Sequence, residues 1–150
     1  MKKQINRALT LIITGIILGA SQLASAQADD HVVVNIPFAF AAGDRQLPAG
    51  RYTVRRVRLD STALVIRSED GRESAMVLTN ATGNEARQVK LTFRQYGGHH
   101  FLAGVWLPGA NGGRELPESK TERSLRREQA AKAGGGKGSA AQTVNVYGVR

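Results

Sequence analysis

Residues 63–79, ALVIRSEDGRESAMVLT, contain two short segments rich in β-branched and apolar residues on either side of Asp70-Gly71. An Asp-Gly dipeptide between two such segments predicts a β-hairpin closed by a two-residue type I′ turn. Pairing outward from that turn gives apolar pairs below an opposite-charge pair at the tip, which are mutually consistent. The predicted pairs are Leu64 with Val77, Ile66 with Ala75 and Glu69 with Arg72.

The segments on both sides of this hairpin also follow the two-residue period of β-strands. His31–Phe40, Val89–Phe93 and Phe101–Leu107 place apolar side chains at alternate positions. Arg51–Leu59 changes phase midway, which predicts a β-bulge at Arg55-Arg56. Turn-forming segments rich in glycine, proline, asparagine and aspartate separate the strands. The pattern predicts an all-β domain, a small antiparallel barrel or sandwich of about 7–8 strands, over residues 27–117.

A different composition begins at Glu118. Ser119 and Glu122 have the spacing of a capping box, and residues 118–133 predict one basic helix. Leu125 is the only large apolar residue of this helix, so we expect it to be loosely attached. A glycine-rich stretch follows, which predicts a flexible tail over residues 134–150. Within that tail, Thr143–Val149 alternates and is a candidate last strand.

The start of the chain has the three parts of a secretory signal peptide. Three basic residues precede an apolar run, Ala8–Ala20, and a small-residue cleavage site ends at Ala26. A second such site allows cleavage after Ala28 instead. Because the apolar run is shorter than the roughly 20 residues that span a bilayer, we expect cleavage and no transmembrane segment in the mature chain. The expected location is the periplasm or the outside of the cell.

Composition narrows the class of protein further. The chain contains no cysteine, which together with its short basic leader favours a bacterial envelope or extracellular protein. Its excess of Lys and Arg over Asp and Glu favours loose contact with an anionic envelope polymer. The aromatic residues are too scattered to predict a nucleic-acid stacking surface, so we expect no specific nucleic acid. The candidate polyanion contacts are Arg55, Arg56 and Arg58 on a strand, and Arg123, Arg126 and Arg127 on the helix.

One metal site is a candidate, and it depends on where the signal is cut. Cleavage after Ala28 would leave Asp29, Asp30 and His31 at the mature N-terminus. A free amine, two deprotonated amides and a third-position imidazole form a four-nitrogen square plane, which suits Cu(II) or Ni(II). Cleavage after Ala26 removes this arrangement. No other cofactor is expected.

Catalytic motifs give no positive signal. The chain has no cysteine nucleophile, no Gly-x-Ser-x-Gly sequence and no phosphate-binding glycine loop before a helix. Its carboxylates lie mainly in predicted turns and in the helix. We therefore expect a non-catalytic β-module with a structural or binding role. A small extracellular enzyme, for example one active on glycans, is the alternative, because residues distant in sequence can form a site without a local motif.

Four segments carry a resemblance to a known family. They are VNIPFAFAAGDRQLPAGRYTVRRV (34–57), ALVIRSEDGRESAMVLT (63–79), LTFRQYGGHHFLAGVW (91–106) and GGRELPESKTERSL (112–125). The most specific part is Pro-Phe-x-Phe, then Gly, then Leu-Pro-Ala-Gly-x-Tyr-x-Val. Together these segments resemble a family of small secreted proteins of unknown function from acidobacteria. The resemblance covers about residues 32–127 and implies an exported β-domain, with no known activity or site residues.

Overall fold

The structure is a computed structural model that describes residues 31–58, 61–83, 87–108, 112–132 and 141–149. The predicted leader, both cleavage positions and the glycine-rich stretch after the helix lie outside these residues. The strands are β1 (His31–Ile36), β2 (Phe40–Ala42), β3 (Arg45–Leu47), β4 (Gly50–Arg56), β5 (Ala63–Ser68), β6 (Ser74–Leu78), β7 (Asn80–Ala81), β8 (Lys90–Tyr96), β9 (His99–Trp106), β10 (Arg114–Glu115) and β11 (Gln142–Val149). The helix is α2 (Lys120–Lys132).

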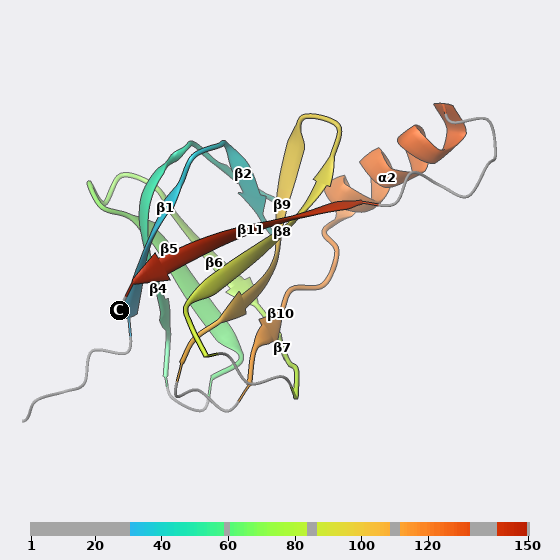
Figure 1. The fold of residues 1–150 in the computed structure, drawn as a ribbon. Coiled ribbons are helices and arrows are strands. Elements are labelled where there is room, and N and C mark those ends of the chain that lie inside the picture. Colours follow the sequence, from blue (N-terminus) through green and yellow to red (C-terminus); the bar gives the residue numbers. More distant parts are fainter. Residues whose placement is uncertain (1–30, 59–60, 84–86, 109–111, 133–140, 150) are drawn as a thin grey trace, which may run out of the picture.

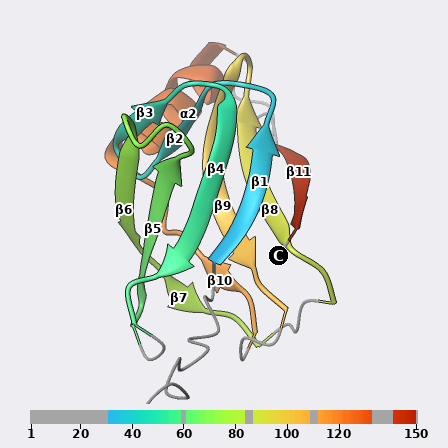
Figure 2. The same ribbon diagram turned by 90° about the vertical axis from the view of Figure 1, so that its left-hand side faces the viewer.

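The eleven strands form one sheet that curls into a nearly closed barrel, with α2 projecting from one end (Figure 1). The strand order is β3-β2-β9-β8-β11-β1-β4-β5-β6, and β10 joins β9 to β7. Among the described pairs, only β2 with β9 is parallel. Figure 2 shows β1, β4, β5 and β6 side by side on one wall of the barrel. The predicted all-β barrel followed by one helix is confirmed, and the added strands are short: β2, β3, β7 and β10 have two or three residues each.

Apolar side chains from alternate strand positions fill the interior of the barrel. The predicted register of the β5–β6 hairpin is confirmed, with Leu64 opposite Val77 and Ile66 opposite Ala75. All four of these side chains are buried. Phe40 lies at the centre, where it makes edge-to-face contacts with the rings of Tyr52 and Phe93. The core therefore follows from the two-residue period of the sequence, except in β9. There the register to β8 shifts, so that Leu102 joins Val105 in the core, and the alternation predicted for Phe101 is wrong because Phe101 packs with Tyr96 in a separate cluster.

The turn between β5 and β6 differs from the predicted type I′ turn. Gly71 has φ 72°, but no described residue other than glycine has a positive φ, so Asp70 does not have the conformation that a type I′ turn needs. The amide of Gly71 donates to the carbonyl of Ser68 at 2.9 Å, which makes Glu69 and Asp70 the central residues of a four-residue turn. The Asp70 carboxylate accepts hydrogen bonds from the Ser68 hydroxyl and the Arg72 amide, and these bonds lower the pKa of Asp70. The side chain of Asp70 thus stabilises a turn of another type.

The predicted charge pair at the tip of the hairpin is also wrong. Glu69 lies 3.6 Å from Arg51 of β4, and Arg72 lies 3.6 Å from Asp70. Glu69 is therefore linked to the neighbouring strand and not across the hairpin. The reason is the longer turn, in which Glu69 and Arg72 no longer flank a two-residue loop.

The β-bulge predicted at Arg55-Arg56 is wrong as well. β4 pairs with β5 in one continuous register from Tyr52 to Arg56. The change of phase in the sequence instead marks the end of the strand, and Val57 beyond it is 40% exposed. Arg55 is consequently exposed on the outer face, and Arg56 has the inward position of its neighbours Val54 and Tyr52, at the end of the barrel.

The first turns of α2 are attached more firmly than the sequence predicts. The Glu122 amide donates to the Ser119 hydroxyl at 3.1 Å, which confirms one half of the capping box. The Glu122 carboxylate does not return to Ser119. It is only 2% exposed and accepts two hydrogen bonds from the Arg94 guanidinium of β8, one of them at 3.0 Å. Leu125 packs beside Tyr96 on the same side of the barrel. A buried ion pair thus replaces the apolar contacts that the helix lacks.

The candidate last strand is an integral part of the barrel. β11 lies between β8 and β1, with six residue pairs to β8 and with Val33 opposite Val149 on β1. A side chain at Gly148 would reach within 2.6 Å of the Val33 carbonyl oxygen, so glycine allows this close approach. The barrel therefore extends beyond the predicted limit at residue 117, and the tail contributes a strand to it.

Candidate binding surface along strand β6

Strand β6 lies at one end of the strand order, and β3 lies at the other. The amide of Ser68 donates to Glu73, and the amide of Thr79 donates to Thr62, so the odd-numbered residues of this segment bond to β5. The main-chain N–H and C=O groups of Ser74, Met76 and Leu78 therefore point away from β5. Within the part of the chain that the structure describes, these groups have no strand partner.

A groove of about 810 Å³ follows this seam of the barrel. One wall is β6, and the others are the β2–β3 turn and the segment that leads into α2. Gly43 lies against Val77 at the seam, and an ion pair of 3.6 Å joins Arg45 to Glu73 across it. The lining residues are Ala42–Gln46, Ser74–Leu78 and Leu116–Ser119.

The outer face of the β4–β5–β6 wall carries an apolar strip. Met76 and Leu78 are each 69% exposed. In the sheet, Met76 is opposite Val65, and Leu78 is opposite Ala63. Val57, just beyond the end of β4, donates its amide to the Ala63 carbonyl and so lies at the same end of the strip. We call these five residues, Val57, Ala63, Val65, Met76 and Leu78, the β6 patch.

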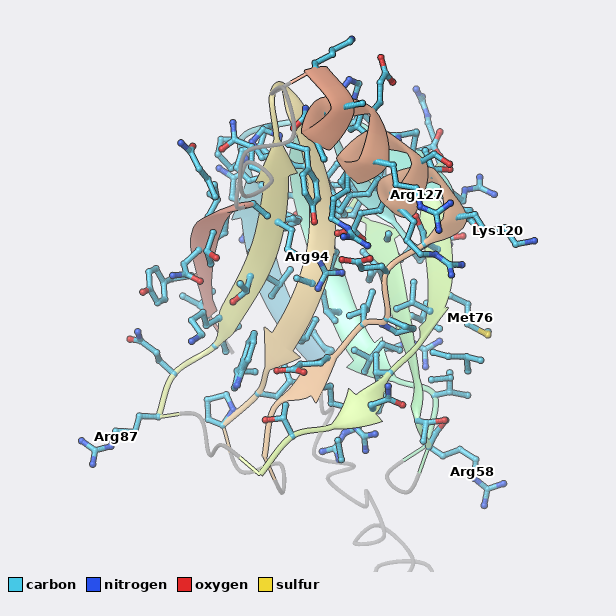
Figure 3. The ribbon with its side chains drawn as sticks, turned by 90° about the vertical axis from the view of Figure 1, so that its right-hand side faces the viewer. Arg58, Met76, Arg87, Arg94, Lys120 and Arg127 are labelled. Atoms are coloured by element: carbon cyan, nitrogen blue, oxygen red, sulfur yellow. The ribbon has the colours of Figure 1, made fainter. Side chains whose placement is uncertain are left out.

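Two arginines border the β6 patch on this wall. Arg55 lies opposite Val65, and Arg67 lies opposite Ser74, two residues along β6 from Met76. Both are exposed, and neither has a carboxylate partner among the described residues. Figure 3 extends this pattern: Lys120, Met76 and Arg58 follow one another from top to bottom along one edge of the molecule, all pointing outward. Cations therefore lie on both sides of exposed apolar side chains.

The six arginines predicted to contact polyanions do not form one site. Arg58 lies at the bottom of the barrel and Arg127 at the top, so the strand group and the helix group are at opposite ends (Figure 3). Arg126 is held by Glu118 at 3.2 Å. Arg123 and Arg127 share a helix face with Lys120, because these positions are three and seven residues apart. Of the strand group, Arg55 borders the β6 patch, and Arg56 has the inward position already described.

The candidate N-terminal metal site is only partly within the structure. His31 opens β1 opposite Arg55. Asp29 and Asp30 lie outside the described residues, so copper or nickel binding stays a prediction. Elsewhere in the described ranges, no group of three or more His, Cys, Asp or Glu side chains is placed to hold a metal ion.

Two aromatic residues that look scattered in the sequence lie in one row of the sheet. Tyr147 is opposite Lys90, and Lys90 is opposite Trp106. Lys90 Nζ lies 4.4 Å from the centre of the Trp106 ring, and Gly104 and Gly113 lie against the same side chain. The indole is therefore partly covered by its neighbours, and Lys90 separates it from Tyr147 in this row.

Comparison of the chain with family models, with curated proteins and with solved structures found no match. The resemblance to a secreted family therefore stays a prediction. None of the helical segments that the structure describes is long and apolar enough to cross a membrane.

Sequence analysis missed Met76 and Leu78 as surface residues. The alternation of side chains along the predicted strand does indicate this exposure. Because Ala75 and Val77 point inward, the residues between and beside them, including Met76 and Leu78, point outward. Two large apolar residues on the outward positions of a half-buried strand are unusual and indicate a contact surface. The position of β6 at the end of the sheet order could not be read from the hairpin alone.

Proposed function

We propose that the chain is an exported, non-catalytic β-module that binds a partner in the cell envelope or outside the cell, and that strand β6 is its contact surface. The observation that carries this proposal is the combination at β6 of two strongly exposed apolar side chains with main-chain groups that have no strand partner among the described residues. Edge strands of this kind associate with other surfaces unless charge or proline protects them. β6 (SAMVL) contains neither.

The seam groove supports binding better than catalysis. The barrel interior is filled by apolar side chains, so the groove lies at the surface and not in a deep cleft. Its two acidic side chains come from different segments: Asp44 is exposed in the β2–β3 turn, and Glu118 is held by Arg126. Catalysis by a carboxylate pair needs two groups that face each other across the reacting bond.

Photocrosslinking in the native host tests the contact surface. A photoreactive amino acid at Met76 should give a covalent adduct with envelope material on irradiation. The same amino acid at Tyr147, which is 56% exposed on a different part of the barrel, is the matched control. Adducts at both positions, or at Tyr147 alone, would contradict a contact surface at β6.

Export is tested separately by mass. The protein recovered from the envelope or the culture medium should lack either 26 or 28 N-terminal residues, because the cleavage sites end at Ala26 and Ala28. The intact mass also decides whether the mature chain begins at Asp29, which the metal site requires. Recovery of the chain with Met1 from the membrane fraction would contradict export.

A further inference from the structure

We infer that the β6 patch and the cations around it bind the surface of an anionic lipid bilayer. This inference rests on the proposed function, since it names the partner of the β6 surface. The argument has three parts: the apolar strip, the charges that border it, and the shape of the edge on which both lie.

The apolar part consists of side chains that a folded protein normally keeps from water. Met76 and Leu78 are 69% exposed and Val57 is 40% exposed. Met76 and Leu78 are adjacent on the outer face of β6, and Ala63 of β5 lies between Leu78 and Val57. At the boundary between headgroups and acyl chains, such side chains can enter the apolar layer while the main chain stays among the headgroups. Met76 points directly away from the barrel (Figure 3), as this placement requires.

The charges complement an anionic surface. Arg55 and Arg67 border the patch without carboxylate partners among the described residues, and Lys120 and Arg58 extend along the same edge. The acidic residues near this edge are already engaged. Glu73 pairs with Arg45 and Glu118 with Arg126. Glu69 and Asp70, which line one hollow with Arg55 and Arg67, pair with Arg51 and Arg72. Asp44 is the remaining acidic side chain of the groove, and it belongs to the β2–β3 turn on the other wall. The charge next to the exposed apolar side chains is therefore positive.

This combination favours a lipid surface over two other occupants. A second copy of the chain would bring Arg55 and Arg67 of both copies together, and like charges in contact oppose association. A linear anionic polymer would use the cations but would leave Met76 and Leu78 in water. Only an anionic surface with an apolar layer beneath it uses both groups of residues.

Vesicle co-sedimentation of the mature chain tests the inference. The probes are vesicles of phosphatidylcholine alone and of equimolar phosphatidylcholine and phosphatidylglycerol. We expect binding to the phosphatidylglycerol vesicles only. We also expect it to weaken as salt rises, because screening at 0.15 M ionic strength acts over about 8 Å. Equal sedimentation with both vesicles, or with neither, would overturn the inference.

Substitutions at exposed positions separate the two contributions. M76S/L78S should lower the partition coefficient by at least about tenfold, since the apolar part of two side chains no longer leaves water. R55Q/R67Q should lower it by about fivefold per arginine on the anionic vesicles. The matched control is Y147S/V149S, which removes two apolar side chains that are 56% and 65% exposed on another strand and should leave binding unchanged. An equal loss in the control would contradict the β6 patch as the contact.

The absence of cysteine from the chain allows a direct measurement of depth. An environment-sensitive fluorophore on M76C should shift to shorter wavelength on the anionic vesicles, and the same fluorophore on Y147C should not. Binding without this shift, and with full retention in M76S/L78S, would indicate a polymer-like electrostatic contact and would overturn the inference. A photocrosslink from Met76 to a protein in the native host would also overturn it, while supporting the binding module proposed above.

Discussion

Trp106 illustrates how much a single side chain depends on its neighbours. It lies on the outer face of β9, opposite Lys90, and the residues that contact it come from β8, β9 and the segment before β10. A Cβ atom would lie 2.5 Å from the indole at Gly104 and 2.2 Å from it at Gly113. Glycine at both positions leaves room for the ring close to the main chain. No pattern in the sequence indicates this, since Gly113 reads as part of a turn.

Gly113→Ala should therefore destabilise the barrel. The added methyl group forces the indole out of its position, and overpacking of this kind costs about 1–3 kcal/mol. Urea unfolding measures the loss. Gly98→Ala is the matched control, because a side chain there would meet nothing within 4 Å. If both variants unfold at the same urea concentration, the requirement for glycine at position 113 is wrong. If adding Trp106→Leu to Gly113→Ala restores the urea midpoint, the clash with the indole is the cause of the lost stability.

His100 gives the barrel a dependence on pH. Its ring stacks on Phe38 with centroids 3.9 Å apart. Burial lowers the pKa of His100, the nearby backbone of Ala39 opposes this shift, and His99 lowers the pKa further. Because the folded pKa is below the ordinary value of about 6.5, the unfolded chain takes up the proton first as pH falls. Above about pH 6.5, neutral His100 makes its full contribution to the stability of the fold. This contribution is lost as the pH falls from about 6.5 toward the lower pKa of His100 in the folded protein.

The expected result is a lower urea midpoint at about pH 5.5 than at about pH 7.5, with a smaller difference in His100→Phe, which keeps a ring against Phe38. His99→Gln removes the exposed neighbour and should keep most of the difference. An unchanged pH difference in His100→Phe would assign the effect to other groups.

At the scale of elements, α2 depends on one ion pair. Glu122→Ala leaves Arg94 without its partner. Because Arg94 is partly exposed, we expect the loss of this pair to lower the free energy of unfolding by no more than about 3 kcal/mol. We expect trypsin to cleave after Arg123 and Arg127 at least about tenfold faster, because a helix that detaches opens to the protease. Glu128→Ala is the control, since Glu128 is exposed and pairs only along the helix with Lys132. Equal cleavage rates in the two variants would contradict the anchor.

We expect the folded barrel to need β11 as much as it needs its other long strands. A chain ending at Lys132 leaves β1 and β8 with open edges and uncovers Val34 and Val89 beside Gly148. We expect that chain to lose cooperative unfolding and to aggregate. A synthetic peptide of residues 141–149 should restore the far-ultraviolet β-signal, and the same peptide with Gly148→Leu should not. Cooperative unfolding of the shortened chain alone would refute this role.

The elements differ in how far the sequence predicts them. The β5–β6 register is correct because apolar pairs repeat over several positions on both strands. The four shortest strands are too brief to show a period, and the Arg94–Glu122 pair joins residues that no local pattern connects. The predicted type of the β5–β6 turn was wrong because an aspartate is compatible with two kinds of turn. It tolerates a positive φ, and its carboxylate can also accept hydrogen bonds in a turn without one, as Asp70 does here.

At the scale of the whole molecule, alternation predicts a barrel but does not say where the barrel opens. The seam lies between β6 and β3 because β2 pairs with β9 and β11 enters beside β1, two choices that depend on contacts distant in the sequence. The fold separates the two arginine groups to opposite ends of the barrel, and it places Arg55 in one row of the sheet with Met76, with Val65 between them. The sequence therefore shows which residues belong to the candidate surface, but it does not show that the fold brings them together.

The pairing of β1 with β11 has a consequence for the time course of folding. These are the first and last strands of the described fold, and Val33 meets Val149. Contacts between residues so distant along the chain form late, and domains dominated by them fold in milliseconds to seconds. During synthesis, β1 has to wait for β11 before the barrel can close. We expect the refolding of this barrel to be slow compared with that of a helical domain of the same length.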